Sequence, residues 1–209
     1  MDPIEIIGLP QSNFVWATRI AAAEKGVPHA NTPLPPGHPD IAGLHPLGRI
    51  PLLRQGGLVL AESRAIMAWL DHGFDGPALM PRDARAAAEA EQWVSLVVTA
   101  AEPVLIRRYL FAYLFPGTPD GSPDRARIDA VLPEMDRHLA MLDGALAGGF
   151  LGGPAFTLAD AYLVPILYWL RTLPEAGQRI AAARHMPGYI DRMMARPSVA
   201  ATTPPPLPR

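Results

Sequence analysis

Two neighbouring residues, Glu62 and Ser63, stand directly before a segment with a helical apolar pattern that includes Ile66, Met67 and Leu70. The N-terminus of a helix carries unpaired amides and a partial positive charge, and it therefore favours a ligand carboxylate. A serine hydroxyl adds a hydrogen-bond donor, and a glutamate can bind an ammonium group. Together these groups suit the head group of an amino acid, although a Glu-Ser pair before a helix also occurs simply as a helix cap.

Pro51 follows Ile50 at the start of a predicted strand in the segment "RIPLLRQGGLVLAES". Proline lacks a backbone N–H, so the backbone of Ile50 is left free to pair with another chain. A cis Ile50-Pro51 bond would hold this strand edge open for an extended, peptide-like ligand. An ordinary proline at a sheet edge is the alternative interpretation, and the spacing alone does not decide between them.

The elements that must position these residues form a small α/β unit. Apolar runs, turn residues and helix start and stop signals predict the following order: strand 4–7, helix 13–25, edge strand 27–34, at most a turn or two of helix near 39–48, hairpin 50–61, and a helix from 62 or 63. Gly56 and Gly57 are expected to take positive φ in the hairpin turn, which we place at residues 54–57.

A segment rich in glycine and proline at 72–83 is typical of a linker, and the chain after it shows only helical patterns. The predicted helices are 84–115, 123–147, 158–172, 186–196 and, more weakly, 177–184. Pro103 and Pro165 fall inside two of them and are expected to bend or break them. Thr157 and Asp160 have the spacing of a capping box, which we assign to folding.

The composition excludes several classes of protein. Nearly half of the 209 residues are apolar and only 18% are charged, which indicates a folded chain, and a net charge of -2 offers no basic patch for nucleic acid. No apolar run suggests a membrane span, and the N-terminus lacks the features of a secretory signal, so we expect a cytoplasmic protein. The histidines show no ligand spacing and the chain has no cysteine. We therefore expect no metal site, and any reactive thiol must come from a ligand.

The segment "HPLGRIPLL", with its glycine hairpin and "LVLAESRAIMAWLD", resembles the glutathione-binding segment of the cytosolic glutathione transferases. That family has Asn-Pro-x-Gly-x-x-Pro and then Glu-Ser-x-Ala-Ile; its asparagine is His45 here, at a structural rather than a ligand position, and Pro51 would be its cis-proline. "FTLADAYLVPIL" and "MMARPSVAAT" are similar to the family's capping segment and closing helix. The resemblance spans almost the whole chain. It implies a thioredoxin-like α/β domain over 1–76, an all-α domain over 84–209, and a homodimer.

Carried over by position, the resemblance implies that the first domain binds glutathione. Glu62 and Ser63 would bind its γ-glutamyl head, and the backbone of Ile50 would pair with its cysteinyl unit. Arg49 stands where the family often has Lys or Gln and could reach the glycyl carboxylate, and His38 is a weaker candidate for the same end.

Glutathione would supply the thiol that the chain lacks. A free thiol has a pKa of about 8.5, and only the thiolate is the nucleophile, so the protein must stabilise the charged sulfur. In the family this donor comes from the turn after the first strand, which is "GLPQSNF" here. Ser12 aligns with the family's serine, and Asn13 offers an amide donor beside it. A hydroxyl bonded to the sulfur would lower the thiol pKa by about one to two units. Ser12 could instead only cap the next helix.

The resemblance also implies that a small hydrophobic electrophile binds between the domains, which makes a serine-type glutathione transferase the leading prediction. The segment "LIRRYLFAYLF" and a later tryptophan supply candidates for this site, although aromatic residues at helical spacing are also typical of a core. The candidates are Arg107, Arg108, Tyr109, Tyr113 and Trp169.

Two other functions stay open. The segment "SNFVWATRIAA" partly resembles the zeta-class stretch Ser-Ser-Cys-x-Trp-Arg-Val-Arg-Ile-Ala-Leu, whose class isomerises maleyl keto acids. Phe14 replaces its cysteine and Ala17 its substrate-facing arginine, which argues against isomerase activity. A non-catalytic glutathione-binding or interaction module would keep the same fold, and the tail "TTPPPLPR" could meet a partner as polyproline II.

Overall fold

A computed structural model describes residues 2–207 of the chain. They divide into two compact units. The first comprises the residues up to Arg82 together with those from Met194 onward, and the second comprises Asp83–Met193. A sheet lies in the first unit, and the second is helical, which confirms the predicted fold class.

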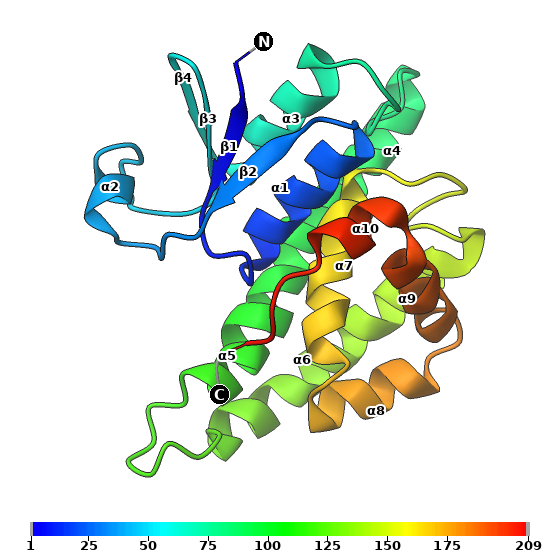
Figure 1. Cartoon of the computed structure of the whole chain (residues 1–209). Helices are drawn as coiled ribbons and strands as arrows, with labels where there is room; N and C mark the ends of the chain where they lie inside the picture. Colours follow the sequence, from blue (N-terminus) through cyan, green and yellow to red (C-terminus); the bar gives the residue numbers. More distant parts are fainter. Residues whose placement is uncertain (1, 208–209) are drawn as a thin grey trace. The chain divides into compact units, whose positions relative to one another are not determined.

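The sheet of the first unit has four strands in the order β2-β1-β3-β4 (Figure 1). The strands are β1 (Ile4–Ile7), β2 (His29–Thr32), β3 (Leu52–Gln55) and β4 (Leu58–Ala61). β1 pairs in parallel with β2 and antiparallel with β3, and β3 pairs antiparallel with β4. The predicted edge strand is therefore confirmed. The hairpin turn is shorter than predicted, because the strand continues through residue 55, and of its two glycines only Gly56 has a positive φ, of 55°.

Helices cover both faces of this sheet, as Figure 1 shows. The helices α1 (Asn13–Glu24) and α3 (Ser63–Gly73) pack together on one face. The short helix α2 (Pro39–Ala42) lies on the other, where its Ile41 joins a buried cluster with Ile7 and Leu52. Because successive strand residues point to opposite faces, Ile6 and Leu53, which pair in the register, face α1 and α3.

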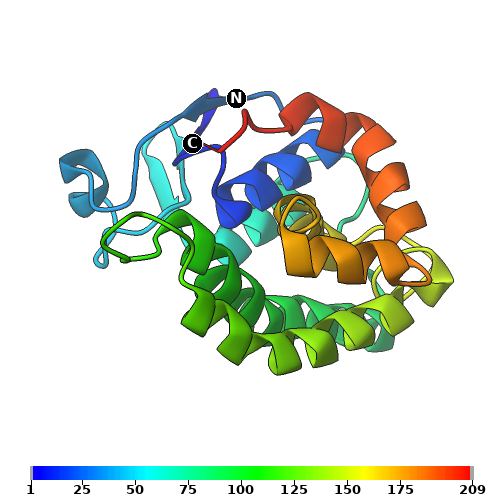
Figure 2. The ribbon, with the colours of Figure 1, turned by 90° about the horizontal axis from the view of Figure 1, so that it is seen from below.

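The last helix, α10 (Pro197–Thr202), belongs to the first unit and lies beside α1 (Figure 2). Arg196 donates from Nη2 to Glu24 Oε2 over 2.7 Å, and the Trp16 indole N–H donates to Thr202 Oγ1 over 3.1 Å. The predicted all-helical domain, 84–209, includes this segment. These contacts join it to the first unit instead.

The second unit contains the remaining helices, except for the last two residues of α9. They are α4 (Ala84–Ser95), η1 (Leu96–Ala101), η2 (Pro103–Leu110), α5 (Phe111–Leu114), α6 (Arg125–Ala145), η3 (Leu146–Gly148), α7 (Leu158–Leu170), α8 (Pro174–Ala182) and α9 (Met186–Ala195). The buried α7 is apolar on all sides. Thr157 and Asp160 form the capping box at its start, as the sequence predicts.

Neither of the two prolines breaks its helix. Pro165 lies within an uninterrupted α7. Around Pro103 the chain takes the wider π-helical winding of η1 and η2, and the Glu102 amide donates to the carbonyl of Val97, five residues earlier. The wider turn accommodates a residue without an N–H, so the chain stays helical at Pro103 and does not break there.

Candidate functional site

The register of the sheet brings three separate segments to one end of it. Ile7, the last residue of β1, lies opposite Leu52, the first residue of β3, and Leu52 lies opposite Ala61, the last residue of β4. The turn that follows β1, the residues that precede β3 and the residues that follow β4 are therefore neighbours, since adjacent strands lie about 4.8 Å apart. Ser12 belongs to the first of these segments and Glu62 to the last.

The middle segment contains Ile50 and Pro51, whose peptide bond is cis. β3 begins only at Leu52, so the Ile50 amide and carbonyl lie outside the paired sheet. Gly8 in the turn after β1 packs closely against this segment: a Cβ on Gly8 would lie 3.0 Å from the Ile50 Cβ and 2.6 Å from Val15 Cγ2. A larger residue at Gly8 would push the two segments apart.

Glu62 and Ser63 stand where β4 passes into α3. Glu62 has φ of 69°, which is unusual for a residue with a side chain, and it makes no side-chain cap to α3. Ser63 is the buried first residue of the helix. The Glu62 side chain is 70% exposed, and one of its oxygens lies 3.5 Å from Nε2 of His45. No local sequence pattern links His45 to Glu62, and the resemblance implies only a structural position for His45.

Ser12 occupies the N-cap position of α1 with an extended backbone, but its hydroxyl makes no cap hydrogen bond to that helix. Ser12 therefore stands at the cap position without a side-chain bond to the helix, and its role stays a prediction. The first turn of α1 contains no acidic residue, so the helix N-terminus keeps its positive potential for an anion. Asn13, the first residue of the helix, is buried.

His38 and Arg49, the two candidates for binding the glycyl carboxylate, follow two glycines that are hydrogen-bonded to each other. The Gly37 amide donates to the Gly48 carbonyl over 2.9 Å, so the next residues, His38 and Arg49, start from neighbouring backbone positions. The His38 ring caps α2, since its Nδ1 accepts from the Asp40 amide over 3.2 Å. Arg49 is exposed, and within residues 2–207 no acidic side chain pairs with it. The guanidinium of Arg49 is therefore the more available cation.

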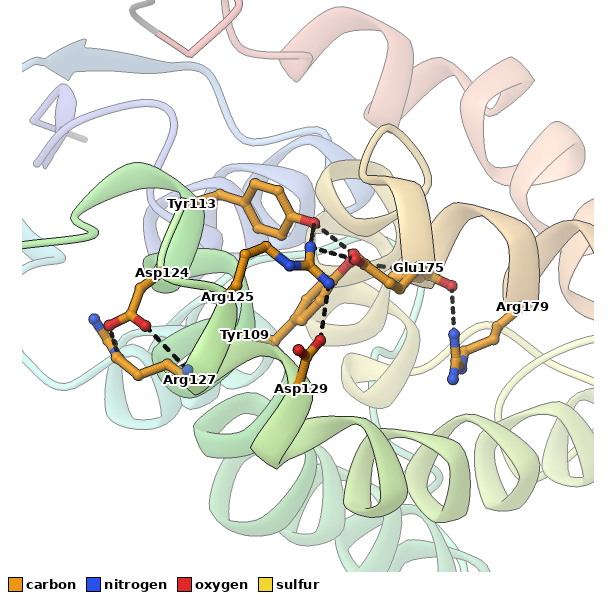
Figure 3. A network of polar contacts seen from close by, with 9 residues as sticks. Tyr109, Tyr113, Asp124, Arg125, Arg127, Asp129, Glu175 and Arg179 are labelled. Carbon is orange, nitrogen blue, oxygen red and sulfur yellow. Dashed lines mark hydrogen bonds and ion pairs between the residues drawn. The ribbon is translucent and has the colours of Figure 1, made fainter. Parts of the chain in front are cut away.

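In the helical unit, the hydroxyls of Tyr109 and Tyr113 both donate to one oxygen of Glu175, over 2.9 and 2.5 Å (Figure 3). Arg125 donates to the other oxygen over 2.6 Å. Burial raises the pKa of both tyrosines. Burial alone would also raise the pKa of Glu175, but the hydrogen bonds from Tyr113 and Arg125 outweigh it and lower that pKa to about 2. Both tyrosine hydroxyls thus belong to an internal ionic network.

The remaining electrophile candidates have contacts of their own or are buried. Arg107 pairs with Glu102 over 3.0 Å and lies 5.3 Å from the ring centre of Phe111, and Arg108 pairs with Glu134. Trp169 is buried in α7. The stretch Pro103–Leu110 is π-helical, so the spacing of its side chains around the helix differs from that of an α-helix. The electrophile site itself stays a prediction.

Two further findings concern the described residues, 2–207. No group of three or more histidine, aspartate or glutamate side chains among them could hold a metal ion. None of the helices in that range is both long and apolar enough to span a membrane.

Comparisons with known proteins agree with this geometry. A family model described as the glutathione S-transferase N-terminal domain matches residues 11–72, and one described as the C-terminal domain matches 82–197. Glutathione S-transferase 3 of Zea mays is 32% identical over 100% of this chain and 98% of its own length. A maleylpyruvate isomerase of a Ralstonia species is 32% identical over 70% of this chain and 73% of its own. The structure of a theta-class glutathione S-transferase from Xanthomonas axonopodis pv. citri, with glutathione bound, is similar at a TM-score of 0.84, with 28% identity and complete coverage of both chains.

Proposed function

The chain belongs to the glutathione S-transferase family, and from this premise we propose that Ser12 stabilises the thiolate of glutathione bound at the end of the sheet. The enzyme is a glutathione transferase, and glutathione is its co-substrate. The observation that carries the proposal is the Ser12 hydroxyl, which stands at the N-terminus of α1 without capping it. It is held beside the segment through which glutathione would bind.

The proposed binding mode uses the three segments at this end of the sheet. The backbone of Ile50, outside the paired strands, would bind the cysteinyl unit as a short added strand. The exposed carboxylate of Glu62 would bind the ammonium of the γ-glutamyl head, and Ser63 at the start of α3 its carboxylate. Arg49 would pair with the glycyl carboxylate, with His38 as the weaker alternative.

Thiolate stabilisation follows from the chemistry of the donor. A hydrogen bond to a charged acceptor contributes about 1.5 to 3 kcal/mol, which corresponds to a fall in the thiol pKa of about one to two units. The uncompensated N-terminus of α1 acts in the same direction. Asn13 is the second candidate donor in the same turn.

The proposal is tested by Ser12→Ala, with Ser12→Thr as the matched control that keeps the hydroxyl. We expect the alanine variant to bind glutathione with nearly unchanged affinity while the pKa of the bound thiol, followed by its ultraviolet absorbance, rises by about one to two units. The rate of conjugation at neutral pH should fall about tenfold or more. An unchanged thiol pKa in Ser12→Ala would show that another donor, with Asn13 the first to test, stabilises the sulfur.

A second candidate activity is the glutathione-dependent isomerisation of a maleyl keto acid, which the similarity to the Ralstonia maleylpyruvate isomerase favours. Ala17, which stands where the zeta-class stretch has its substrate-facing arginine, is fully buried. That burial argues against a direct substrate contact from this position. A direct isomerase assay with maleylpyruvate decides between the two activities.

The electrophile and the assembly belong to the proposal as well. We propose a small hydrophobic electrophile, with Arg107, Arg108, Tyr109, Tyr113 and Trp169 as candidates for its site, and a homodimer in the cytoplasm. A panel of alkyl and aryl electrophiles tests the proposed substrate class. Sedimentation of the purified chain tests the proposed homodimer.

A further inference from the structure

His45 lies beneath the exposed carboxylate of Glu62 and has a defined orientation. Its ring is buried, with 4% of the residue exposed. The Leu47 amide donates to Nδ1 over 2.9 Å, so Nδ1 is the unprotonated nitrogen and the ring proton of the neutral tautomer lies on Nε2. Nε2 is the atom that faces Glu62 Oε1, at 3.5 Å.

Glu62 needs such a partner for two reasons. Its backbone has φ of 69°, a conformation that is unfavourable for a residue with a side chain and must be held by its surroundings. Its side chain is 70% exposed and does not cap α3, and the contact recorded for its carboxylate in the described chain is the one with His45. An exposed glutamate otherwise loses considerable rotamer entropy when it binds a ligand.

We infer that His45 is a positioning residue: its Nε2–H orients the carboxylate of Glu62 toward the ammonium group of glutathione. One carboxylate oxygen lies 3.5 Å from Nε2, and the exposed remainder of the group would receive the ligand. The inference rests on the proposed role of Glu62. It assigns a ligand-binding contribution to a position where the family has asparagine and where the sequence indicates only a structural role.

The experiment uses two substitutions, each of which keeps one of the two hydrogen-bonding functions of the imidazole. His45→Asn keeps an acceptor near the position of Nδ1 for the Leu47 amide, and it is also the family's own residue, so the loop should fold; it lacks the reach to Glu62. His45→Gln keeps a donor near the position of Nε2. We expect His45→Asn to raise the Kd for glutathione about fivefold to tenfold, as loss of one such contact implies, and His45→Gln to restore most of the affinity. The kcat at saturating glutathione should stay within about twofold in both.

A double-mutant cycle separates this inference from the proposed function. Glu62→Ala keeps the Cβ, so the cost of the positive φ is unchanged while the carboxylate is removed. If His45 acts through Glu62, His45→Asn has no further effect on Kd in the Glu62→Ala background. Equal effects of His45→Asn in both backgrounds, or an affinity that His45→Gln fails to restore, would overturn the inference. If Glu62→Ala alone leaves Kd unchanged, the proposed clamp is itself wrong.

The matched control is His72→Asn, at an exposed histidine in the last turn of α3. It should leave both Kd and kcat at the wild-type values. Thermal unfolding of every variant checks that the differences in affinity do not come from loss of folded protein.

Discussion

At the scale of single residues, Arg49 offers the most direct test of how the bound tripeptide is oriented. Its guanidinium is exposed and carries no acidic partner within residues 2–207, so its charge is available to a ligand. We expect Arg49→Ala to raise the Kd for glutathione about threefold to tenfold at low salt and less at high salt, since an exposed ion pair is screened. Glutathione amidated at its glycyl carboxylate should bind the wild type and the variant equally well.

The control for this prediction is Arg54→Ala, an exposed arginine on β3 that pairs with Glu5 over 3.4 Å. It should not change the affinity. If Arg49→Ala weakens glutathione and its amide to the same extent, Arg49 does not bind the glycyl carboxylate, and His38 becomes the residue to test.

The residues of the candidate site could be predicted from the sequence only where a local pattern identified them. The helix start at Glu62 and Ser63 and the turn that holds Ser12 are local patterns, and the structure places these residues at one end of the sheet. The contact between His45 and Glu62 depends on which ring nitrogen accepts a hydrogen bond, and no spacing in the sequence contains that information. The partner of Tyr109 and Tyr113 is a glutamate more than sixty residues away.

At the scale of elements, the capping box of α7 is the feature whose energetic role is most clearly separable from function. The Thr157 hydroxyl accepts from the Ala159 amide over 3.2 Å, and Asp160 accepts from the Thr157 amide over 2.9 Å. We expect Thr157→Ala to lower the free energy of unfolding by about 1 kcal/mol, measured in urea, because one helix amide loses its acceptor. Thr157→Ser, which keeps the hydroxyl, should retain most of that stability.

The same variants test the assignment of this box to folding. Below the unfolding transition, Thr157→Ala should conjugate glutathione at the wild-type rate. A fall in kcat/KM without a fall in stability would contradict the assignment and connect α7 to the catalytic site.

The positions of the strands and helices were predicted more reliably than the type of helical turn around the prolines. Apolar periodicity and cap residues were sufficient for the strands and for nearly all the helices, because these signals are local. A proline, by contrast, signals only that a backbone donor is missing. Whether the chain breaks, bends or widens its turn depends on the packing around it, which is why Pro103 gives π-helical turns and Pro165 leaves α7 uninterrupted.

At the scale of the whole molecule, the sequence could not predict where the last segment of the chain belongs. The composition and helical patterns after residue 84 are continuous, so the sequence placed 84–209 in one domain. The contacts that join this segment to the first unit, between Arg196 and Glu24 and between Thr202 and Trp16, connect residues more than 170 positions apart. Burial alone would raise the pKa of Glu24, but the hydrogen bonds from Arg196 and Ser198 outweigh it and lower that pKa. The compact unit to which a segment belongs thus depends on contacts between residues that are far apart in the sequence.

The pH dependence of global stability follows from Asp160, whose pKa burial raises from 3.8 to about 6 despite the hydrogen bonds that it accepts. The folded chain therefore binds a proton more tightly at this site than the unfolded chain does. Its contribution is fully present below about pH 4 and is lost as pH rises through about 6, on the order of 3 kcal/mol. Glu175 has the opposite sign: its pKa is lowered from 4.5 to about 2, so its contribution is present above about pH 5 and begins to fall only at the acid end of this window.

We therefore expect the free energy of unfolding in urea, at one fixed protein concentration, to fall between about pH 4 and pH 7 more steeply in the wild type than in Asp160→Asn, which cannot titrate. The asparagine variant is expected to be less stable overall, because an amide offers one acceptor oxygen where the Leu151 and Thr157 amides and the Tyr189 hydroxyl now share two. The comparison therefore rests on the slope and not on the absolute value. Asp191→Asn, at an exposed acid of α9, should keep the wild-type slope. Parallel curves for the wild type and Asp160→Asn would mean that Asp160 stays ionised throughout, and that the three hydrogen bonds to its carboxylate outweigh its burial.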